Sequence, residues 1–169
     1  MGTQNEEGTP NLALFSQVLH ISAAPARLGI LFRPEGAERH SLHNLRATRL
    51  LSLNALPLGF VEAMHCTSAN FPRTVSEFEA CGLKATYREG VSVPLVEEAW
   101  VQLLLEPEEQ LEVKSSGGLL LVARVLDLLI DERALDASGQ PQPDGLQHVC
   151  GLDLYSLSES IQSMPYARP

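Results

Sequence analysis

Five short apolar runs, each bounded by proline, glycine or charged residues, constrain the fold of this chain more than any other feature. They cover residues 11–21, 27–32, 50–56, 100–105 and 119–130. Runs of this kind are typical of buried β-strands. The last run is long enough for a helix, but the glycines before it and the β-branched residues within it favour a strand. So many strands predict a barrel or a sandwich.

Three segments between these runs have helical spacing. Ser41 is a suitable N-cap for a helix that continues to Thr48, because its hydroxyl can accept from backbone N–H groups of the first turn. Residues 59–66 and 75–80 offer apolar side chains at helical intervals, and Gly82 is suited to close the second. The whole pattern predicts a β-rich α+β fold.

The chain is expected to form a single domain over residues 1–169, because it has no internal repeat, low-complexity tract or linker. Residues 136–145 carry Ser-Gly, Pro-x-Pro and Asp-Gly signals, which predict a surface turn. Residues 151–169 are expected to form a strap across a neighbouring part of the molecule.

The net charge of −9 argues against nucleic acid or an anionic membrane as a partner, since both select for basic surfaces. The longest apolar stretch, residues 118–130, is interrupted by Arg124 and Asp127 and is shorter than the roughly 20 residues of a membrane-spanning helix. The first residues are polar and acidic, unlike a secretory signal. We therefore expect a cytoplasmic protein.

The three cysteines are Cys66, Cys81 and Cys150. Their odd number and wide spacing give neither a disulfide framework nor a paired metal knuckle. We expect reduced, mostly buried thiols.

The basic residues are concentrated near the start. Five arginines stand against four glutamates in the first 50 residues, a local charge of +1, and the rest of the chain carries −10. This distribution places any anion-binding site in the first third of the chain. The alternative is that these arginines only solubilise the ends of strands.

Motifs spread along the chain resemble those of the flavin-reductase-like family, which includes the flavoredoxins. Residues 8–16 are similar to its Gly-x-x-Asn-x-Ala-Pro-[Tyr/Phe]-Ser strand, and residues 39–45 to its Lys-Asp-Thr-x-x-Asn-Ile. Residues 67–72, 77–83 and 151–155 resemble Thr-Ser-x-x-[Phe/Tyr]-Pro, Glu-Phe-x-x-Ala-Gly-Leu and Gly-x-x-x-Tyr. The matches are collinear and cover nearly the whole chain.

The resemblance implies a split β-barrel with a few short helices, a homodimer, and non-covalent FMN near the subunit interface. The family usually has a strand before this point, and here either the start is trimmed or another segment replaces that strand. If a strand is lost, a dimer partner could cover the exposed edge.

The resemblance places the FMN phosphate at Arg39, Ser41 and Asn44, where free N–H groups at a helix start favour an anion. The alternative is an ordinary helix cap beside an exposed arginine. Arg33 is either a second phosphate contact or a solvated residue at the end of a strand.

The strand after Pro10 would run past the flavin, with backbone groups and the Asn11 amide at the ring edge and Ser16 nearer the phosphate. The cofactor-binding residues expected here are Asn11, Leu12, Ala13, Phe15 and Ser16. Leu14 departs from the family proline. The alternative is a plain strand that starts near Asn11.

Two further elements are assigned roles by the resemblance. Residues Thr67, Ser68 and Phe71 belong to a loop that lies over the flavin or the partner subunit, although the first two could simply end a helix. Tyr155 packs on the flavin or at the interface.

Other chemistry is weakly supported. Histidines at 40, 43, 65 and 148 form no recognised ligand set, so no metal is expected. No acid–base dyad is visible, and the catalytic residues are unknown.

The predicted function is electron transfer from NAD(P)H through FMN to a small acceptor or free flavin, in which the cofactor does the chemistry. The alternative is a non-catalytic flavin carrier, or a split barrel that has lost its cofactor.

Overall fold

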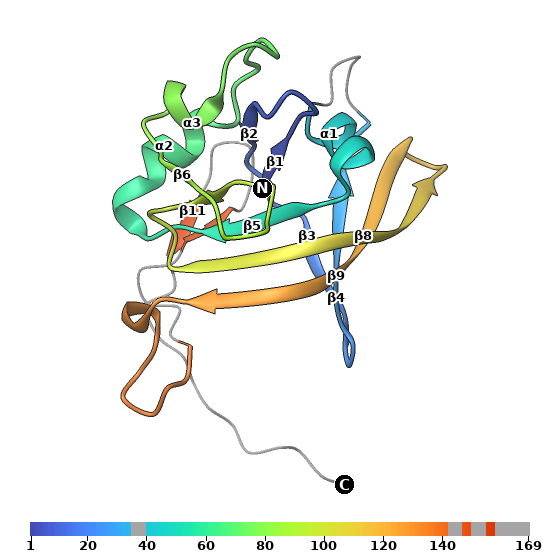
Figure 1. Ribbon diagram of the computed structural model, residues 1–169. Helices are drawn as coiled ribbons and strands as arrows, with labels where there is room; N and C mark the ends of the chain where they lie inside the picture. The colour runs from blue at the N-terminus through green and yellow to red at the C-terminus, as the bar shows by residue number, and fades with distance from the viewer. Residues whose placement is uncertain (35–39, 142–146, 150–154, 158–169) are drawn as a thin grey trace, which may run out of the picture.

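The computed structural model describes residues 1–34, 40–141, 147–149 and 155–157. Its main element is an antiparallel seven-stranded sheet in the order β2-β1-β5-β8-β9-β4-β3 (Figure 1). These strands are β1 (Gly2–Gln4), β2 (Pro10–Leu12), β3 (Val18–Ala23), β4 (Ala26–Phe32), β5 (Leu51–Ala55), β8 (Val101–Val113) and β9 (Gly118–Ile130). The predicted β-rich α+β split barrel is confirmed.

The hairpin of β8 and β9 forms the central ribbon of the sheet and crosses the molecule from one side to the other (Figure 1). Gly117 closes its turn with a φ of +70°, which a residue with a side chain seldom adopts. Two register shifts, near Leu105 and Glu109, bend the ribbon. The strand predicted for residues 119–130 is confirmed, and the strand predicted for residues 100–105 extends to Val113.

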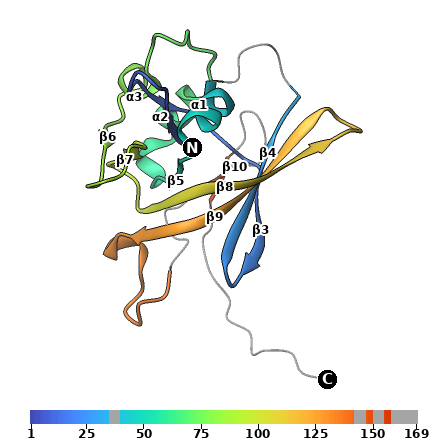
Figure 2. The same ribbon diagram turned by 45° about the vertical axis from the view of Figure 1, so that its right-hand side comes forward.

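The barrel core lies on the inner face of this sheet. Its fully buried members include Ile30, Leu51, Leu105 and Leu121, which come from four neighbouring strands. Helix α1 (His40–Thr48) adds Leu42 and Leu45 to the same cluster. The sheet curves around these side chains, and the β3–β4 hairpin projects away from α1 (Figure 2).

The predicted strand over residues 11–21 is wrong in its middle. The structure breaks it into β2 and β3, with residues 13–17 between them outside any ladder. The apolar pattern of residues 11–21 continues through this break because Phe15 packs on the barrel core. The Phe15 side chain is thus packed on the core although its backbone is not paired with a neighbouring strand. The β1 strand, which the sequence pattern did not indicate, lies between β2 and β5.

A smaller lobe covers the β2 side of the sheet (Figure 1). It contains 3₁₀ helix η1 (Leu58–Phe60), α2 (Val61–Cys66), α3 (Glu77–Ala80), β6 (Ala85–Thr86) and β7 (Leu95–Val96). Its own core joins Leu12, Phe78, Leu83 and Val96. The helix predicted over residues 75–80 is confined to its last four residues and is followed by Gly82 at a φ of +71°.

The expectation of reduced, buried thiols is wrong for two of the three cysteines. Cys66 and Cys81 form a disulfide with a Cα–Cα distance of 5.7 Å, and both are half-buried. The bridge joins the end of α2 to the end of α3, two elements that the sequence spacing alone does not place together. Cys150 lies outside the described residues.

The remaining elements are 3₁₀ helix η2 (Glu132–Ala134), β10 (Gln147–Val149) and β11 (Tyr155–Leu157), and the last two pair with each other. In the predicted surface turn, Asp136 accepts from the backbone N–H groups of Ser138 and Gln140. Most of the predicted strap over residues 151–169 lies outside the described residues. None of the helices that the structure describes is long and apolar enough to span a membrane.

Candidate functional site

Residues 13–17 connect the two edge strands of the sheet, β2 and β3, and close the barrel without a ladder. At one end the Ala13 N–H donates to the Met1 carbonyl over 3.0 Å. At the other end the Leu31 N–H donates to the Gln17 carbonyl, also over 3.0 Å. The segment is therefore held at both ends.

Between these anchors, the backbone of residues 14–16 makes no hydrogen bond to any part of the chain that the structure describes. Phe15 turns inward and packs edge-to-face on Phe32, with ring centroids 5.0 Å apart. Ser16 is exposed. The segment thus offers three consecutive peptide groups whose hydrogen-bonding capacity is open to solvent or to a ligand.

The helix start predicted as an anion site is fixed to β1 and β2 by a buried polar network. The Asn11 side-chain amide donates to Ser41 Oγ over 3.1 Å and to Thr3 Oγ1 over 3.3 Å. The Asn44 amide donates to the same Thr3 oxygen over 3.2 Å. All four side chains are at least nine-tenths buried. The structure therefore brings Asn11 together with Ser41 and Asn44, which lie 30 or more residues further along the sequence.

This network corrects one detail of the sequence prediction. Helix α1 begins at His40, so Ser41 lies inside its first turn, and the oxygen of Ser41 accepts from Asn11 rather than from a backbone N–H. Both N–H bonds of the Asn11 amide are directed at protein oxygens. Asn11 therefore positions the strand against the helix.

The start of the open segment is held from the lobe side by a buried acid. Glu77, which is 5% exposed, accepts from the Leu12 N–H over 2.9 Å. The α-amino group of Met1 donates to the Ala13 carbonyl over 2.7 Å. Burial lowers the pKa of this amine to about 5, although the nearby Glu77 carboxylate acts in the opposite direction.

The structure describes only one of the two arginines expected near the phosphate. Arg33 is exposed directly after β4. Arg39 lies outside the described residues, immediately before α1. Arg27 pairs with Glu108 on the outer surface of the sheet, which fits the alternative that some of these arginines serve strand ends.

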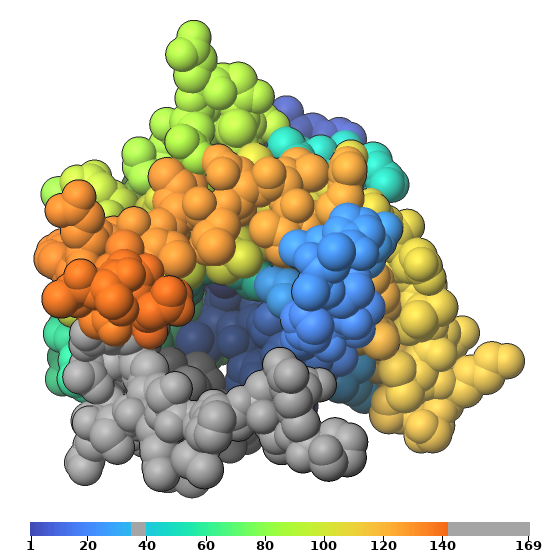
Figure 3. All heavy atoms as spheres, turned by 90° about the horizontal axis from the view of Figure 1, so that it is seen from below, coloured from blue at the N-terminus to red at the C-terminus, as the bar shows by residue number. Residues whose placement is uncertain are grey.

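A hollow is visible when the molecule is viewed from below (Figure 3). Its floor is formed by N-terminal residues, and the β3–β4 hairpin and the end of β9 lie on its rim (Figure 3). His20 and Leu28 are paired across β3 and β4, so they lie on the same face of the sheet. Leu28 packs against the barrel core.

Two residues of this arrangement were not selected from the sequence. Thr3 is fully buried and joins two asparagines, but it lies in a three-residue strand too short to show alternation. Glu77 is part of the Glu-Phe motif, and its burial depends on α3 packing against β2. A buried glutamate in a four-residue helix leaves no periodic signal that a sequence pattern could detect.

The loop assigned to the flavin by resemblance begins as a helix end. Thr67 Oγ1 donates to the Met64 carbonyl over 2.8 Å, and Ser68 Oγ donates to the His65 carbonyl over 2.7 Å. Their hydroxyls therefore terminate α2, as the alternative stated. Phe71 is half-buried in the loop that follows. Tyr155 opens β11.

In the part of the chain that the structure describes, no three histidine, cysteine or acidic side chains are placed to hold a metal ion. The hydrogen-bond donors near this segment are the peptide N–H groups of residues 14–16 and the Ser16 and Ser41 hydroxyls, beside the positive end of the α1 dipole. Such a donor set suits an elongated polar ligand with an anionic end.

Comparison with known proteins relates the chain to flavin proteins. Residues 1–146 match the family model of the flavin reductase like domain. An uncharacterised protein of Halalkalibacterium halodurans is 28% identical over 118 residues, which are 69% of this chain. The chain spans little more than half, 56%, of that curated relative.

Two solved structures have the same architecture. A split-barrel-domain protein from Shewanella frigidimarina is 29% identical, with a TM-score of 0.91 over 98% of this chain and 83% of its own. An FMN-binding protein from Thermus thermophilus, solved with bound 1-cyclohex-2-enone, is 24% identical. Its TM-score is 0.81 over 97% of this chain and 86% of its own, which is a likeness of fold.

Proposed function

The chain belongs to the flavin reductase like domain family, and from this premise we propose that it binds FMN without a covalent link. The observation that carries the proposal is the open segment at residues 14–16, fixed beside the first turn of α1 by the Asn11 network. This arrangement offers donors for a flavin ring at one end and for a phosphate at the other. The Thermus thermophilus protein of the same fold binds FMN.

The phosphate is proposed to bind at the first turn of α1. The positive end of the helix dipole lies at this turn and favours an anion. Ser41 Oγ already accepts from Asn11, so its own hydrogen can be donated to a phosphate oxygen. Arg39 and Arg33 supply the positive charge, and Asn44 holds the turn in place through Thr3.

The ring is proposed to lie along residues 12–16. The backbone N–H groups of Leu14, Phe15 and Ser16 can donate to the carbonyl groups of the pyrimidine edge. Phe15 packs on Phe32 and so fixes the direction of these peptide groups. Leu12 and Ala13 are held by the backbone bonds described above, and they position the segment rather than contact the ligand through their own N–H groups.

The proposed reaction is electron transfer between small molecules in the cytoplasm. Bound FMN would supply the redox chemistry, that is, acceptance of hydride from NADH or NADPH and reduction of a second acceptor. The chain binds and orients the ring and leaves one of its faces open to the two substrates. The acceptor is proposed to be a small molecule or a free flavin. A carrier without reductase activity is the second candidate, because no acid–base pair is present among the described residues of the open segment.

Absorbance of the purified chain tests FMN binding. We expect a yellow protein with an absorbance band near about 450 nm that NADH or NADPH bleaches. A yellow protein that neither nicotinamide bleaches would support the carrier. A colourless protein that takes up no added FMN would refute both.

The phosphate assignment is tested by combining Arg39→Ala with Ser41→Ala. The loss of a charge-assisted hydrogen bond is worth about 1.5–3 kcal/mol, so the Kd for FMN should rise by at least tenfold, roughly. Arg46→Ala is the matched control, because Arg46 is an exposed arginine near the other end of α1. Equal affinities of the two variants would contradict the assignment.

We also propose a homodimer that uses the outer face of the sheet. Register places Leu31, Leu120 and Leu111 in one row across β4, β9 and β8. Leu19 and Ile21 are over 40% exposed and lie over Gly29, beside this row. The patch is therefore a continuous apolar surface of the kind that proteins cover.

Charges beside this apolar patch make it self-complementary. Arg27 pairs with Glu108, and Arg124 pairs with both Glu108 and Glu106. A two-fold axis through the patch can place a basic group of one copy opposite an acidic group of the other.

Sedimentation tests the dimer. The double variant Leu19→Glu with Leu111→Glu should sediment as a monomer, since it buries two charges in the proposed interface. Val75→Glu, an exposed apolar position in the lobe, should remain dimeric. A wild-type monomer at micromolar concentration would contradict the proposal.

A further inference from the structure

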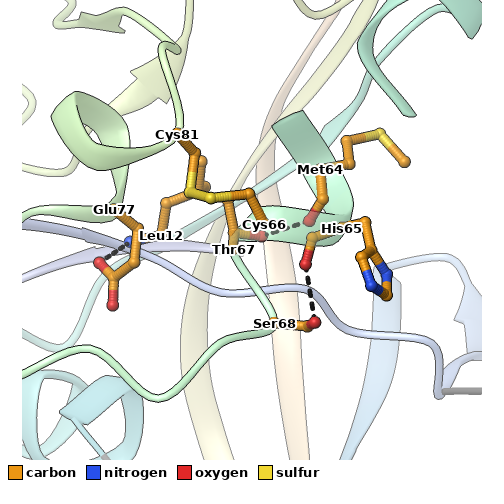
Figure 4. Close-up of a disulfide and its surroundings, with 8 residues drawn as sticks. All are labelled: Leu12, Met64, His65, Cys66, Thr67, Ser68, Glu77 and Cys81. Atoms are coloured by element: carbon orange, nitrogen blue, oxygen red, sulfur yellow. Dashed lines mark hydrogen bonds between the residues drawn. A yellow bond between two sulfur atoms is a disulfide. The ribbon is translucent and has the colours of Figure 1, made fainter. Parts of the chain in front are cut away.

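The Cys66–Cys81 disulfide encloses the segment that holds the open site. The two cysteines are 15 positions apart, at the end of α2 and directly after α3 (Figure 4). Inside the closed loop lies Glu77, whose carboxylate accepts from the Leu12 N–H over 2.9 Å. The Cys81 N–H donates to the Glu77 carbonyl over 2.9 Å, so the bridge lies about one helical turn after the residue that anchors the start of residues 12–16.

The enclosed loop has few other ties to the molecule. Within the described part of the chain, the hydrogen bonds made by residues 68–75 reach no further than three positions along the sequence. Seven of these eight residues are exposed, and Phe71 is half-buried. The disulfide and the Phe78 contact in the lobe core thus fix the loop from its two ends.

The bridge is accessible to a reductant. Both cysteines are half-buried. Of the four residues beside them, His65, Ala80 and Gly82 are exposed and Thr67 is buried. A side chain added at Gly82 would meet no atom within 4 Å, so the space next to Cys81 is open. A thiolate can therefore approach one of the sulfurs from solvent.

A disulfide in the reducing cytoplasm is more often redox-active than structural. We propose that Cys66–Cys81 is a reversible redox site that takes electrons from a dithiol, and that its reduction loosens residues 67–80 and weakens FMN retention. The site itself stands on the geometry above. Its effect on FMN, and the compartment, rest on the proposed function.

The exchange is balanced without a further reactant. A thiolate of the dithiol attacks one sulfur of the bridge, the S–S bond breaks, and a mixed disulfide forms. The second thiol of the reductant then displaces the protein sulfur. Two electrons and two protons pass to Cys66 and Cys81, which become thiols, while the two sulfurs of the reductant become joined.

The first test uses dithiothreitol as the dithiol and the full chain with Cys150→Ser, which removes the third thiol. Alkylation followed by intact-mass measurement should add no label to the oxidised chain and two labels to the folded chain after reduction. Removal of dithiothreitol in air or with oxidised glutathione should restore the unlabelled state. Two free thiols under every oxidising condition, or a bridge that resists dithiothreitol until the chain unfolds, would overturn the proposal.

The second test measures the consequence. Opening a loop of this size should lower Tm by about 6–12 °C. The Kd for FMN should rise by about tenfold, as expected when one or two ordered side chains become mobile. Cys66→Ser with Cys81→Ser should have the Tm and Kd of the reduced chain and should not respond to dithiothreitol, whereas Cys150→Ser alone should still respond.

The two proposals fail in different ways. If the chain takes up no FMN in either state, the proposed function fails, while labelling and Tm still decide whether the redox site exists. If FMN binds with the same Kd in the oxidised chain, the reduced chain and the double serine variant, the coupling is refuted although FMN binding stands.

Discussion

Replacement of Thr3 by valine should separate the role of its hydroxyl from the role of its volume. Thr3 is fully buried, and its Oγ1 accepts from the amides of Asn11 and Asn44. Valine has nearly the same shape but offers no acceptor. The Asn44 amide then loses this partner, and the Asn11 amide keeps only its bond to Ser41.

The expected cost follows from the donors left without partners. A buried donor without an acceptor costs about 1–3 kcal/mol, and one of the two amides keeps a partner. We therefore expect a loss of about 2–4 kcal/mol from a total stability of about 5–15 kcal/mol. Urea unfolding should show the midpoint lower by about 1–2 M with an unchanged m-value.

Thr3→Ser is the matched control. It keeps the hydroxyl and loses only a methyl group, which costs about 0.5–1.5 kcal/mol in a packed core. FMN affinity should fall for the valine variant, because the network fixes the first turn of α1, and should stay near the wild-type value for serine. A valine variant that is as stable as the serine variant would refute the idea that this network holds the helix.

Three further outcomes are expected. Gly2→Ala should lower stability by about 1–3 kcal/mol in thermal unfolding, because the added carbon would lie 2.5 Å from a backbone oxygen and a hydroxyl that bond each other. Gly29→Ala should change it by less than about 0.5 kcal/mol, since the added carbon meets only the ends of flexible side chains; an equal loss for both variants would contradict this contrast. A hydrogen bond from Arg133 lowers the pKa of Asp131 from 3.8 to about 2, so its contribution to stability is present above pH 4, roughly, and lost as the pH falls toward 2. Arg133→Ala should raise this pKa in an NMR titration, and an unchanged value would refute the assigned cause.

The strands that the sequence predicted correctly are those whose burial and ladder coincide. Residues 27–32 and 119–130 contribute Ile30, Phe32, Leu121 and Ala123 to the barrel core, and they also pair with neighbours along their length. Residues 11–21 show the limit of this reasoning. Their apolar pattern comes from packing at Leu12, Phe15 and the outer face of β3, while the backbone between the two strands leaves the sheet.

The site was predictable in its parts but not in its connections. Ser41, Asn44 and Asn11 could be selected from the sequence because motif spacing marks them. Their mutual contacts depend on Thr3 and on the placement of β1 between β2 and β5, which local sequence does not encode. The same holds for Cys66 and Cys81, since a separation of 15 residues becomes 5.7 Å only after the lobe has folded.

The barrel provides its binding groups where its own hydrogen bonding is incomplete. If residues 14–16 were paired with strands on both sides, their peptide groups would all be used in ladders and no donor would remain for a ligand. Here the closure is made at Ala13 and Gln17 only. The cost of the open peptide groups is limited because Leu14 and Phe15 are only half-buried and Ser16 is exposed, so water can replace a ligand. The anchors at Ala13 and Gln17 hold the segment in one conformation with or without a ligand, so a ligand does not have to order it on binding.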